Sequence, residues 1–210
     1  MTEIQARTAL VEAGRRLWER DLVGATEGNL SVRLDNGHLL STPSGVSKGH
    51  LAESDLVVID LQGNALGPGK VSSEIKLHLA IYGERPDCQA VVHAHPLHAT
   101  ALTLCSMSFP NDLVPEGAVV LGRVETVPFG MPGTDEVPDR LRPFLKQSKT
   151  FLLDHHGAVV LGSSPMDAVF RMETLERVAR MYFVASSLGE VSMMPDWAIA
   201  RIAPFASGKL

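Results

Sequence analysis

The chain has 210 residues, of which 45% are hydrophobic and 20% are charged, proportions that are typical of one globular domain. Its formal net charge is −5 and no basic cluster with interleaved aromatic residues occurs, so we expect no nucleic-acid partner. Two cysteines are too few for a disulfide framework, and no apolar run approaches the ~20 residues that span a bilayer, so we expect a cytoplasmic protein without a membrane partner.

Apolar spacing and turn residues predict the elements of the first half of the chain. Helical spacing predicts helices over 3–20 and 72–86. Strands are predicted over 29–34, 37–42 and 88–95, and a strand–turn–strand unit is predicted over 55–66. Pro96 is expected to open a further helix, because proline is favoured at the first helical position.

The second half of the chain contains fewer regular patterns. One or two short strands are expected over 117–129, a helix with Thr134 as N-cap over 133–145, a strand pair or one bent strand over 150–162, and the longest helix over 164–189. The tail, about 190–210, has no clear period. Strands and helices are interspersed, which predicts a single α/β domain over 1–210 with a mixed sheet and helices on both faces.

Histidines are concentrated in two apolar segments. The segment AVVHAHPLHATAL (90–102) contains His93, His95 and His98, and the later segment DHHG contains His155 and His156. Two residues that are two apart on a strand point to the same side, so His93 and His95 could hold one cation, and zinc would need a third ligand. The alternative is that these histidines are satisfied by hydrogen bonds, which is what we expect for His98 and His155.

Small polar residues gather at the ends of three predicted elements. The three segments are 25–32, 41–48 and 71–78. Their backbone N–H groups and hydroxyls could hold an anion, and Ser72 and Ser73 lie at a helix start, where the helix dipole favours a phosphate. The alternative is ordinary turn and capping chemistry. Glu74 follows in the first turn, where the dipole alone favours a carboxylate, but a general base beside a metal would also be a carboxylate here.

The motifs GNLSVR, TPSG, SSE, HAHP and HHG occur in the order and spacing of the class II aldolase/adducin-head family, which the chain resembles over nearly its whole length. Within that family it is most similar to the aldolases that act on L-fuculose 1-phosphate. The resemblance implies a three-layer α/β/α sandwich around a mixed, mostly antiparallel sheet. It also implies a homotetramer with active sites at the subunit interfaces.

The resemblance implies a role for each motif. His93, His95 and His156 would hold a catalytic Zn²⁺, with other divalent transition metals as alternatives. Glu74 would be the catalytic acid/base, and it would ligate the metal when substrate is absent. Seven residues would bind the phosphate of a small phosphorylated sugar: Thr26, Gly28, Asn29, Ser44, Gly45, Ser72 and Ser73.

The implied reaction is cleavage of a phosphorylated ketose, similar to L-fuculose 1-phosphate, to dihydroxyacetone phosphate and an aldehyde through a metal-stabilised enediolate. One alternative is a sugar-acid phosphate decarboxylase, a dehydratase or an epimerase on the same scaffold. A more remote alternative is a non-catalytic adducin-like module. The family's aldolases use tyrosines after HAHP and near the C-terminus, whereas this chain has only Tyr82 and Tyr182, so the proton donor on the aldehyde side is unassigned.

Overall fold

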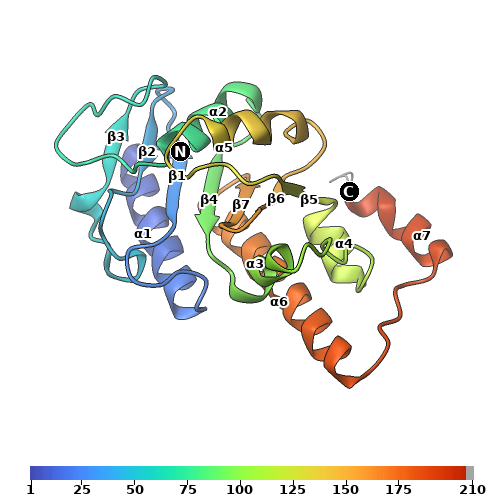
Figure 1. The fold of residues 1–210 in the computed structure, drawn as a ribbon. Coiled ribbons are helices and arrows are strands. Elements are labelled where there is room, and N and C mark those ends of the chain that lie inside the picture. The colour runs from blue at the N-terminus through green and yellow to red at the C-terminus, as the bar shows by residue number, and fades with distance from the viewer. Residues whose placement is uncertain (207–210) are drawn as a thin grey trace.

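A mixed seven-stranded sheet forms the centre of the computed structural model, which describes residues 1–206 (Figure 1). The strands are β1 (Asn29–Arg33), β2 (Leu39–Ser41), β3 (Val57–Ile59), β4 (Ala90–Ala94), β5 (Val124–Val127), β6 (Thr150–Leu153) and β7 (Gly157–Gly162). Their order is β3-β2-β1-β4-β7-β6-β5. Neighbouring strands are antiparallel except the pair of β5 and β6 at one edge, so the predicted mixed, mostly antiparallel sheet is confirmed.

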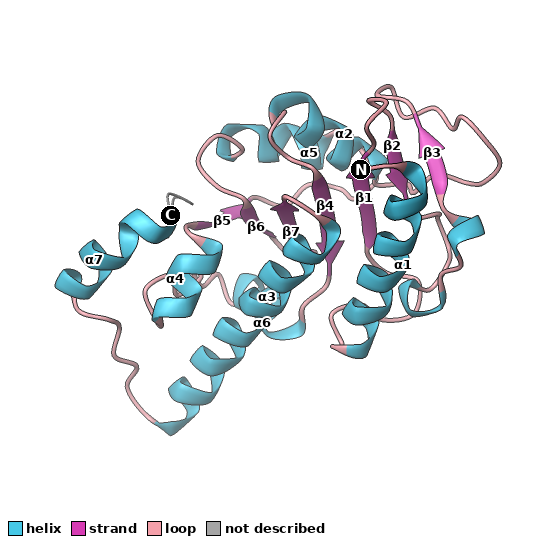
Figure 2. Ribbon diagram, turned by 180° about the vertical axis from the view of Figure 1, so that it is seen from behind, coloured by secondary structure: helices cyan, strands magenta, loops and turns pink. Residues whose placement is uncertain are grey.

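Helices cover both faces of the sheet (Figures 1 and 2). They are α1 (Glu3–Glu19), α2 (Ile75–Glu84), α3 (Leu97–Leu104), α4 (Pro115–Leu121), α5 (Glu136–Leu141), α6 (Pro165–Leu188) and α7 (Asp196–Ala206). Three short 3₁₀ helices are η1 (Lys48–His50), η2 (Glu53–Asp55) and η3 (Arg142–Phe144). No helix within residues 1–206 combines the length and the hydrophobicity needed to cross a membrane.

Alternation along the strands divides the apolar interior into two cores. Val92 of β4 and Val160 of β7 belong to the core under α1, α3 and α6, whereas Val91 and Val159 belong to the core under α2 and α5. The central strands are therefore apolar on both faces, and the architecture has three layers, as expected.

The segment 117–121 was predicted as a strand, and this prediction is wrong, because the segment lies in α4. Pro115 occupies the first helical position, and Gly122 ends the helix with a positive φ of 62°. Gly117 packs so closely on α6 that a Cβ atom there would lie 3.0 Å from Val178 Cγ2. A short apolar run does not distinguish a buried helix from a strand, and only Val124–Val127 is extended.

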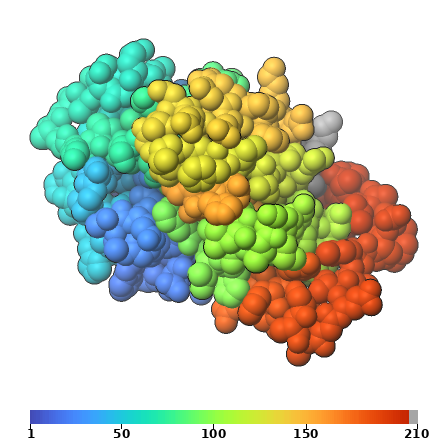
Figure 3. All heavy atoms as spheres, in the orientation of Figure 1, coloured from blue at the N-terminus to red at the C-terminus, as the bar shows by residue number. Residues whose placement is uncertain are grey.

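Other boundaries also differ from the predictions. The expected second strand of segment 55–66 is reduced to a single bridge between Ile59 and Ala65. Thr134 precedes the N-cap of α5, which is Asp135. The tail contains α7, which packs against α4 at one side of the molecule (Figures 1 and 3). Residues 207–210 of the predicted tail lie outside the described residues.

Two Gly→Ala substitutions in helices should have opposite effects on stability. A Cβ atom at Gly14 in α1 would lie 2.7 Å from the carbonyl oxygen of Lys48, so Gly14→Ala should lower the free energy of unfolding by about 1–3 kcal/mol. Gly83 in α2 has open space around it, so Gly83→Ala should raise that free energy by about 0.5–1 kcal/mol. Urea unfolding measures both changes, and a shift of the same sign in the two variants would contradict the described packing of α1 on η1.

Candidate metal centre

The antiparallel pairing of β4 and β7 brings the two histidine segments together. His93 lies near the end of β4, opposite Val159 of β7, and His95 follows β4 directly. His156 directly precedes β7, so all three imidazoles lie at the same end of the two central strands. A Cβ atom at Gly157 would lie 2.7 Å from His95 Cδ2, so only glycine permits this approach.

The three imidazoles form one cluster. One ring nitrogen from each of His93, His95 and His156 lies within 4.8 Å of the corresponding atoms of the other two residues. His93 Nδ1 is 2.9 Å from the Ala158 carbonyl oxygen, which can only accept, so Nδ1 carries a proton and Nε2 is the nitrogen that faces the cluster. His93 Nε2 is 3.1 Å from His95 Nε2. The buried Nδ1 of His156 has no hydrogen-bond partner among residues 1–206.

Burial favours the neutral forms of His95 and His156. Desolvation, followed by the charge of His93, lowers the pKa of His156 to about 4. The same two causes lower the pKa of His95. Converging imidazole nitrogens are the donors that zinc and related divalent metals prefer, so the cluster fits such a metal.

Glu74 completes the cluster from the start of α2. Its Oε2 accepts a 2.8 Å hydrogen bond from Asn29 Nδ2 and lies 3.3 Å from His93 Nε2, while its Oε1 lies 3.2 Å from His156 Nε2. Desolvation by burial opposes its ionisation, but hydrogen bonds from His93 and Asn29 and the charges of His93 and His156 outweigh this effect and hold the pKa of Glu74 below its usual range. The carboxylate is therefore ionised and could act as a fourth ligand or move a proton.

A chain of directed hydrogen bonds reaches Glu74 from the core. Asn29 donates from Nδ2 to Glu74, so its Oδ1 accepts from His78 Nε2 at 2.5 Å. His78 Nδ1 must then accept from Ser31 Oγ at 2.6 Å, and Ser31 Oγ accepts from the Tyr82 hydroxyl at 3.0 Å. Every donor in this chain has one acceptor, so the orientation of the Asn29 amide and of the Glu74 carboxylate is determined.

Sequence reasoning assigned His78 no role at the site. A signal was present, because Glu74, His78 and Tyr82 are spaced four residues apart and so share one face of a helix. Asn29 and Ser31 are two apart and share one face of β1. The contact between these two faces depends on how α2 packs on the sheet, which no local pattern contains.

The three predicted phosphate-binding segments adjoin one another beside the cluster. Ser44 N donates to Lys70 O at 2.9 Å, and a bridge joins Pro43 to Val71, so the segments around Ser44 and Ser72 run side by side. Gly28, with φ at 68°, passes so close to the cluster that a Cβ atom there would lie 2.7 Å from the His93 carbonyl oxygen.

The individual phosphate-binding residues differ in their availability. Thr26, Gly45 and Ser73 are exposed, and Gly45 has the positive φ of 76° that turns the backbone sharply. Ser72 is buried and its hydroxyl accepts from Glu74 N at 3.3 Å. The Asn29 side chain is already engaged by His78 and Glu74. Their phosphate-binding roles stay predictions.

The remaining two histidines of the motifs lie outside the cluster. His98 Nδ1 is 2.6 Å from Glu176 Oε1, and the same carboxylate accepts from the backbone N–H groups of His98 and Ala99 at the start of α3. His155 has a positive φ of 55°, and its ring is hydrogen-bonded to Asp154 at 2.8 Å. Both positions agree with the structural roles expected for these residues.

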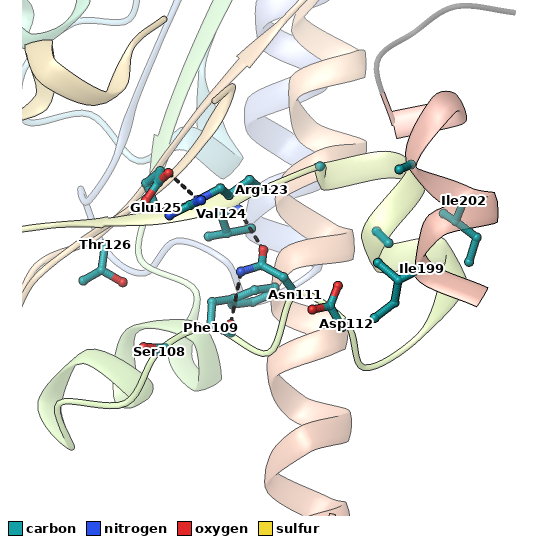
Figure 4. A pocket seen from close by; sticks show the side chains of 13 residues that line it. Ser108, Phe109, Asn111, Asp112, Arg123, Val124, Glu125, Thr126, Ile199 and Ile202 are labelled. Carbon is teal, nitrogen blue, oxygen red and sulfur yellow. Dashed lines mark hydrogen bonds and ion pairs between the residues drawn. The ribbon is translucent and has the colours of Figure 1, made fainter. Parts of the chain in front are cut away.

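A separate cavity of about 580 Å³ lies between the β5 edge of the sheet, the segment before α4, and α7 (Figure 4). Asn111 accepts from Val124 N at 2.8 Å, and Arg123 pairs with Glu125 at 2.6 Å on its wall. Ile199 of α7 faces it from the other side. None of the predicted site residues lines this cavity, so its size does not make it the chemical centre.

Comparison with known proteins agrees with the motifs. Residues 8–183 match the family described as Class II Aldolase and Adducin N-terminal domain. The chain is 37% identical to a 3-oxo-tetronate 4-phosphate decarboxylase of Haemophilus influenzae over 87% of this chain and 89% of that protein. It is 31% identical to an L-fuculose phosphate aldolase of Methanococcus maripaludis, covering 86% and 98% of the two chains. The crystal structure of YgbL from Klebsiella pneumoniae superposes with a TM-score of 0.90 at 34% identity, covering 96% and 99%.

Metal content should depend on the cluster and not on the neighbouring histidine. We expect the purified protein to carry about one zinc ion per chain after reloading and removal of excess metal. His95→Ala should lose most of this zinc, whereas His98→Ala should retain it, because His98 pairs with Glu176 instead. Elemental analysis measures the metal, and full zinc content in His95→Ala would contradict the site.

Stability should fall below neutral pH partly because of His78. Desolvation and the charge of His93 lower its pKa to about 3 in the folded protein, from 6.5. Between these pH values the unfolded chain binds one more proton than the folded one, so stability is lost as pH falls below 6.5, by up to about 1.4 kcal/mol per pH unit. Urea unfolding of metal-free His78→Gln should therefore depend less steeply on pH than that of the wild type.

The variant His50→Gln is the control, because His50 is exposed and its replacement removes a histidine without changing the core. Parallel pH dependences for His78→Gln and wild type would show that the pKa of His78 is the same in the folded and the unfolded chain, which would contradict the lowered pKa.

Proposed function

Because the chain belongs to the class II aldolase and adducin N-terminal domain family, we propose that this enzyme is a metal-dependent lyase that decarboxylates a 3-oxo sugar-acid 4-phosphate. The observation that carries the proposal is the 37% identity to the Haemophilus influenzae decarboxylase over most of both chains. It favours decarboxylation, the alternative given above, over the release of an aldehyde from a phosphorylated ketose.

The donor set supports a resident divalent metal. His93, His95 and His156 would hold it, with Glu74 as a further ligand in the absence of substrate, and Zn²⁺ is the proposed ion because three imidazoles leave one tetrahedral position open. A metal in this position supplies a Lewis acid for negative charge that develops on the substrate's carbonyl oxygen.

The proposed substrate has a carboxylate at C1, a hydroxyl at C2, a carbonyl at C3 and the phosphate at C4. Breaking the C1–C2 bond releases carbon dioxide and leaves the electron pair as an enediolate between C2 and C3. One proton added to C2 then yields dihydroxyacetone phosphate. An aldolase that acts on a phosphorylated ketose passes through the same enediolate, so one scaffold could serve both reactions.

The two reactions differ in what the leaving fragment requires. An aldehyde leaves only when a base removes a proton from its hydroxyl group, whereas carbon dioxide forms directly from the ionised carboxylate. Tyr82 is buried and its hydroxyl is engaged in the hydrogen-bond chain to Glu74, and Tyr182 lies on α6, partly buried against the core, in neither of the two segments where the family's aldolases carry their tyrosines. A decarboxylase does not need this group, which supports the proposal.

Glu74 would then pass a proton from solvent to C2: its carboxylate takes a proton from water and gives it to C2, so that it is ionised again at the end of the turnover. The hydrogen bond from Asn29 holds its carboxylate beside His93 and His156. The phosphate-binding segments would hold C4, so binding energy remote from the reaction would position C2 against Glu74. The homotetramer and the cytoplasmic location stay predictions.

Zinc-loaded enzyme should convert 3-oxo-tetronate 4-phosphate to carbon dioxide and dihydroxyacetone phosphate. In D₂O the product should carry one deuterium on its hydroxymethyl carbon, because the solvent supplies the proton at C2. Glu74→Gln should lower kcat by about 10²–10⁴-fold. A coupled assay for triose phosphate and mass spectrometry measure both effects.

L-Fuculose 1-phosphate is the matched competitor substrate. Formation of an aldehyde from it at a higher kcat/KM than that of the decarboxylation would overturn the proposal and support the aldolase reaction.

A further inference from the structure

Lys48 is a buried lysine at the start of η1. It is 2% exposed, and it belongs to the largest fully buried side chains of the protein. Its backbone is packed against α1, because the Lys48 carbonyl oxygen occupies the space where a Cβ atom of Gly14 would lie. The backbone from which the ammonium group extends is therefore fixed against α1.

The ammonium group connects two of the three phosphate-binding segments. Its Nζ donates to the Val46 carbonyl oxygen at 2.6 Å and to the Thr26 carbonyl oxygen at 2.9 Å. Thr26 precedes Gly28 and Val46 follows Gly45, the two glycines whose positive φ angles shape these segments. The Lys48 side chain thus joins the two loops, in addition to the hydrogen bonds between Leu30 and Thr42 where the same segments enter the sheet.

The charge of Lys48 has no counter-ion in the part of the chain that the structure describes. Within residues 1–206, no carboxylate oxygen lies within 4.0 Å of its Nζ. Burial lowers the pKa of Lys48 accordingly. A buried and unpaired ammonium is costly, and two carbonyl oxygens compensate for only part of the lost hydration. Such a site favours an anion bound close to it.

We propose that Lys48 is the positioning residue of the phosphate site, holding the loops at 24–28 and 42–47 together and providing the positive charge that favours a phosphate bound between them. This inference rests on the proposed phosphorylated substrate. Lys48 acts through the backbone of the loops, since its donors point at their carbonyl oxygens. In a chain with an overall charge of −5, a local positive centre would add to the attraction that the backbone N–H groups exert on a phosphate.

The test compares Lys48→Met with Lys146→Met, which removes an exposed lysine far from the loops in sequence. Calorimetry with inorganic phosphate is the first readout, because it needs no turnover. Lys48→Met should weaken phosphate binding by about 10–100-fold, the effect of losing one charged hydrogen-bonding group. Lys146→Met should leave it unchanged, and zinc content should be equal in both variants.

A purely structural role would not depend on the phosphate of the substrate. We therefore expect Lys48→Met to raise KM for 3-oxo-tetronate 4-phosphate at least about tenfold, and to change kcat/KM for unphosphorylated 3-oxo-tetronate less than twofold. Lys48→Arg, which keeps the charge, should recover part of the phosphate affinity.

If Lys48→Met does not fold, hydrogen exchange of the wild type replaces it. Inorganic phosphate should then protect residues 24–28 and 42–47 together. Unchanged phosphate affinity in Lys48→Met, or phosphate protection of only one loop, would overturn the role of Lys48. Phosphate binding that depends on Lys48 in a protein that does not decarboxylate the substrate would refute the proposed reaction and leave this inference intact.

Discussion

The antiparallel pairing of β4 with β7 is the interaction on which the rest of the structure depends. It joins the two central strands of the sheet, and it separates the two apolar cores, because alternate residues of each strand face opposite sides. The same pairing sets His93 beside β7 and brings His156 to the end of β4. Gly157 permits the close approach of the two segments, so the packing of the core and the geometry of the cluster have one origin.

Charge at the site is arranged in two parts. Three imidazoles and one carboxylate form a centre that suits a cation, and the buried ammonium of Lys48 contacts the backbone of loops that suit an anion. The proposed substrate has groups of both kinds, a carbonyl oxygen for the metal and a phosphate for the loops. The metal centre and Lys48 are therefore each matched by a group of suitable charge on the proposed substrate.

Most strands and the pair of His93 and His95 could be predicted because their signals are local, since period two along 90–95 puts both histidines on one side. The choice of His156 and the mostly antiparallel sheet came from the family resemblance, because the apolar runs around DHHG fit either a strand pair or one bent strand. The α4 helix could not be recognised, since the run GAVVL fits a buried helix or a buried strand equally well. Two further contacts could not be predicted, because each joins segments that are distant in sequence. His78 donates to Asn29, and Lys48 donates to the backbone of the loops.

The topology also has a consequence for the order in which the chain folds. The strand β4 pairs with strands that are far away along the chain, as the hydrogen bond between His93 and Ala158 shows, which joins residues 65 positions apart. The chain loses conformational entropy when such long loops close, before the long-range contacts that stabilise them have formed. We therefore expect slow folding. No short fragment of the chain can assemble the three imidazoles. Metal capture should therefore follow completion of the central sheet, and a nascent chain should remain free of tightly held zinc until β7 has left the ribosome.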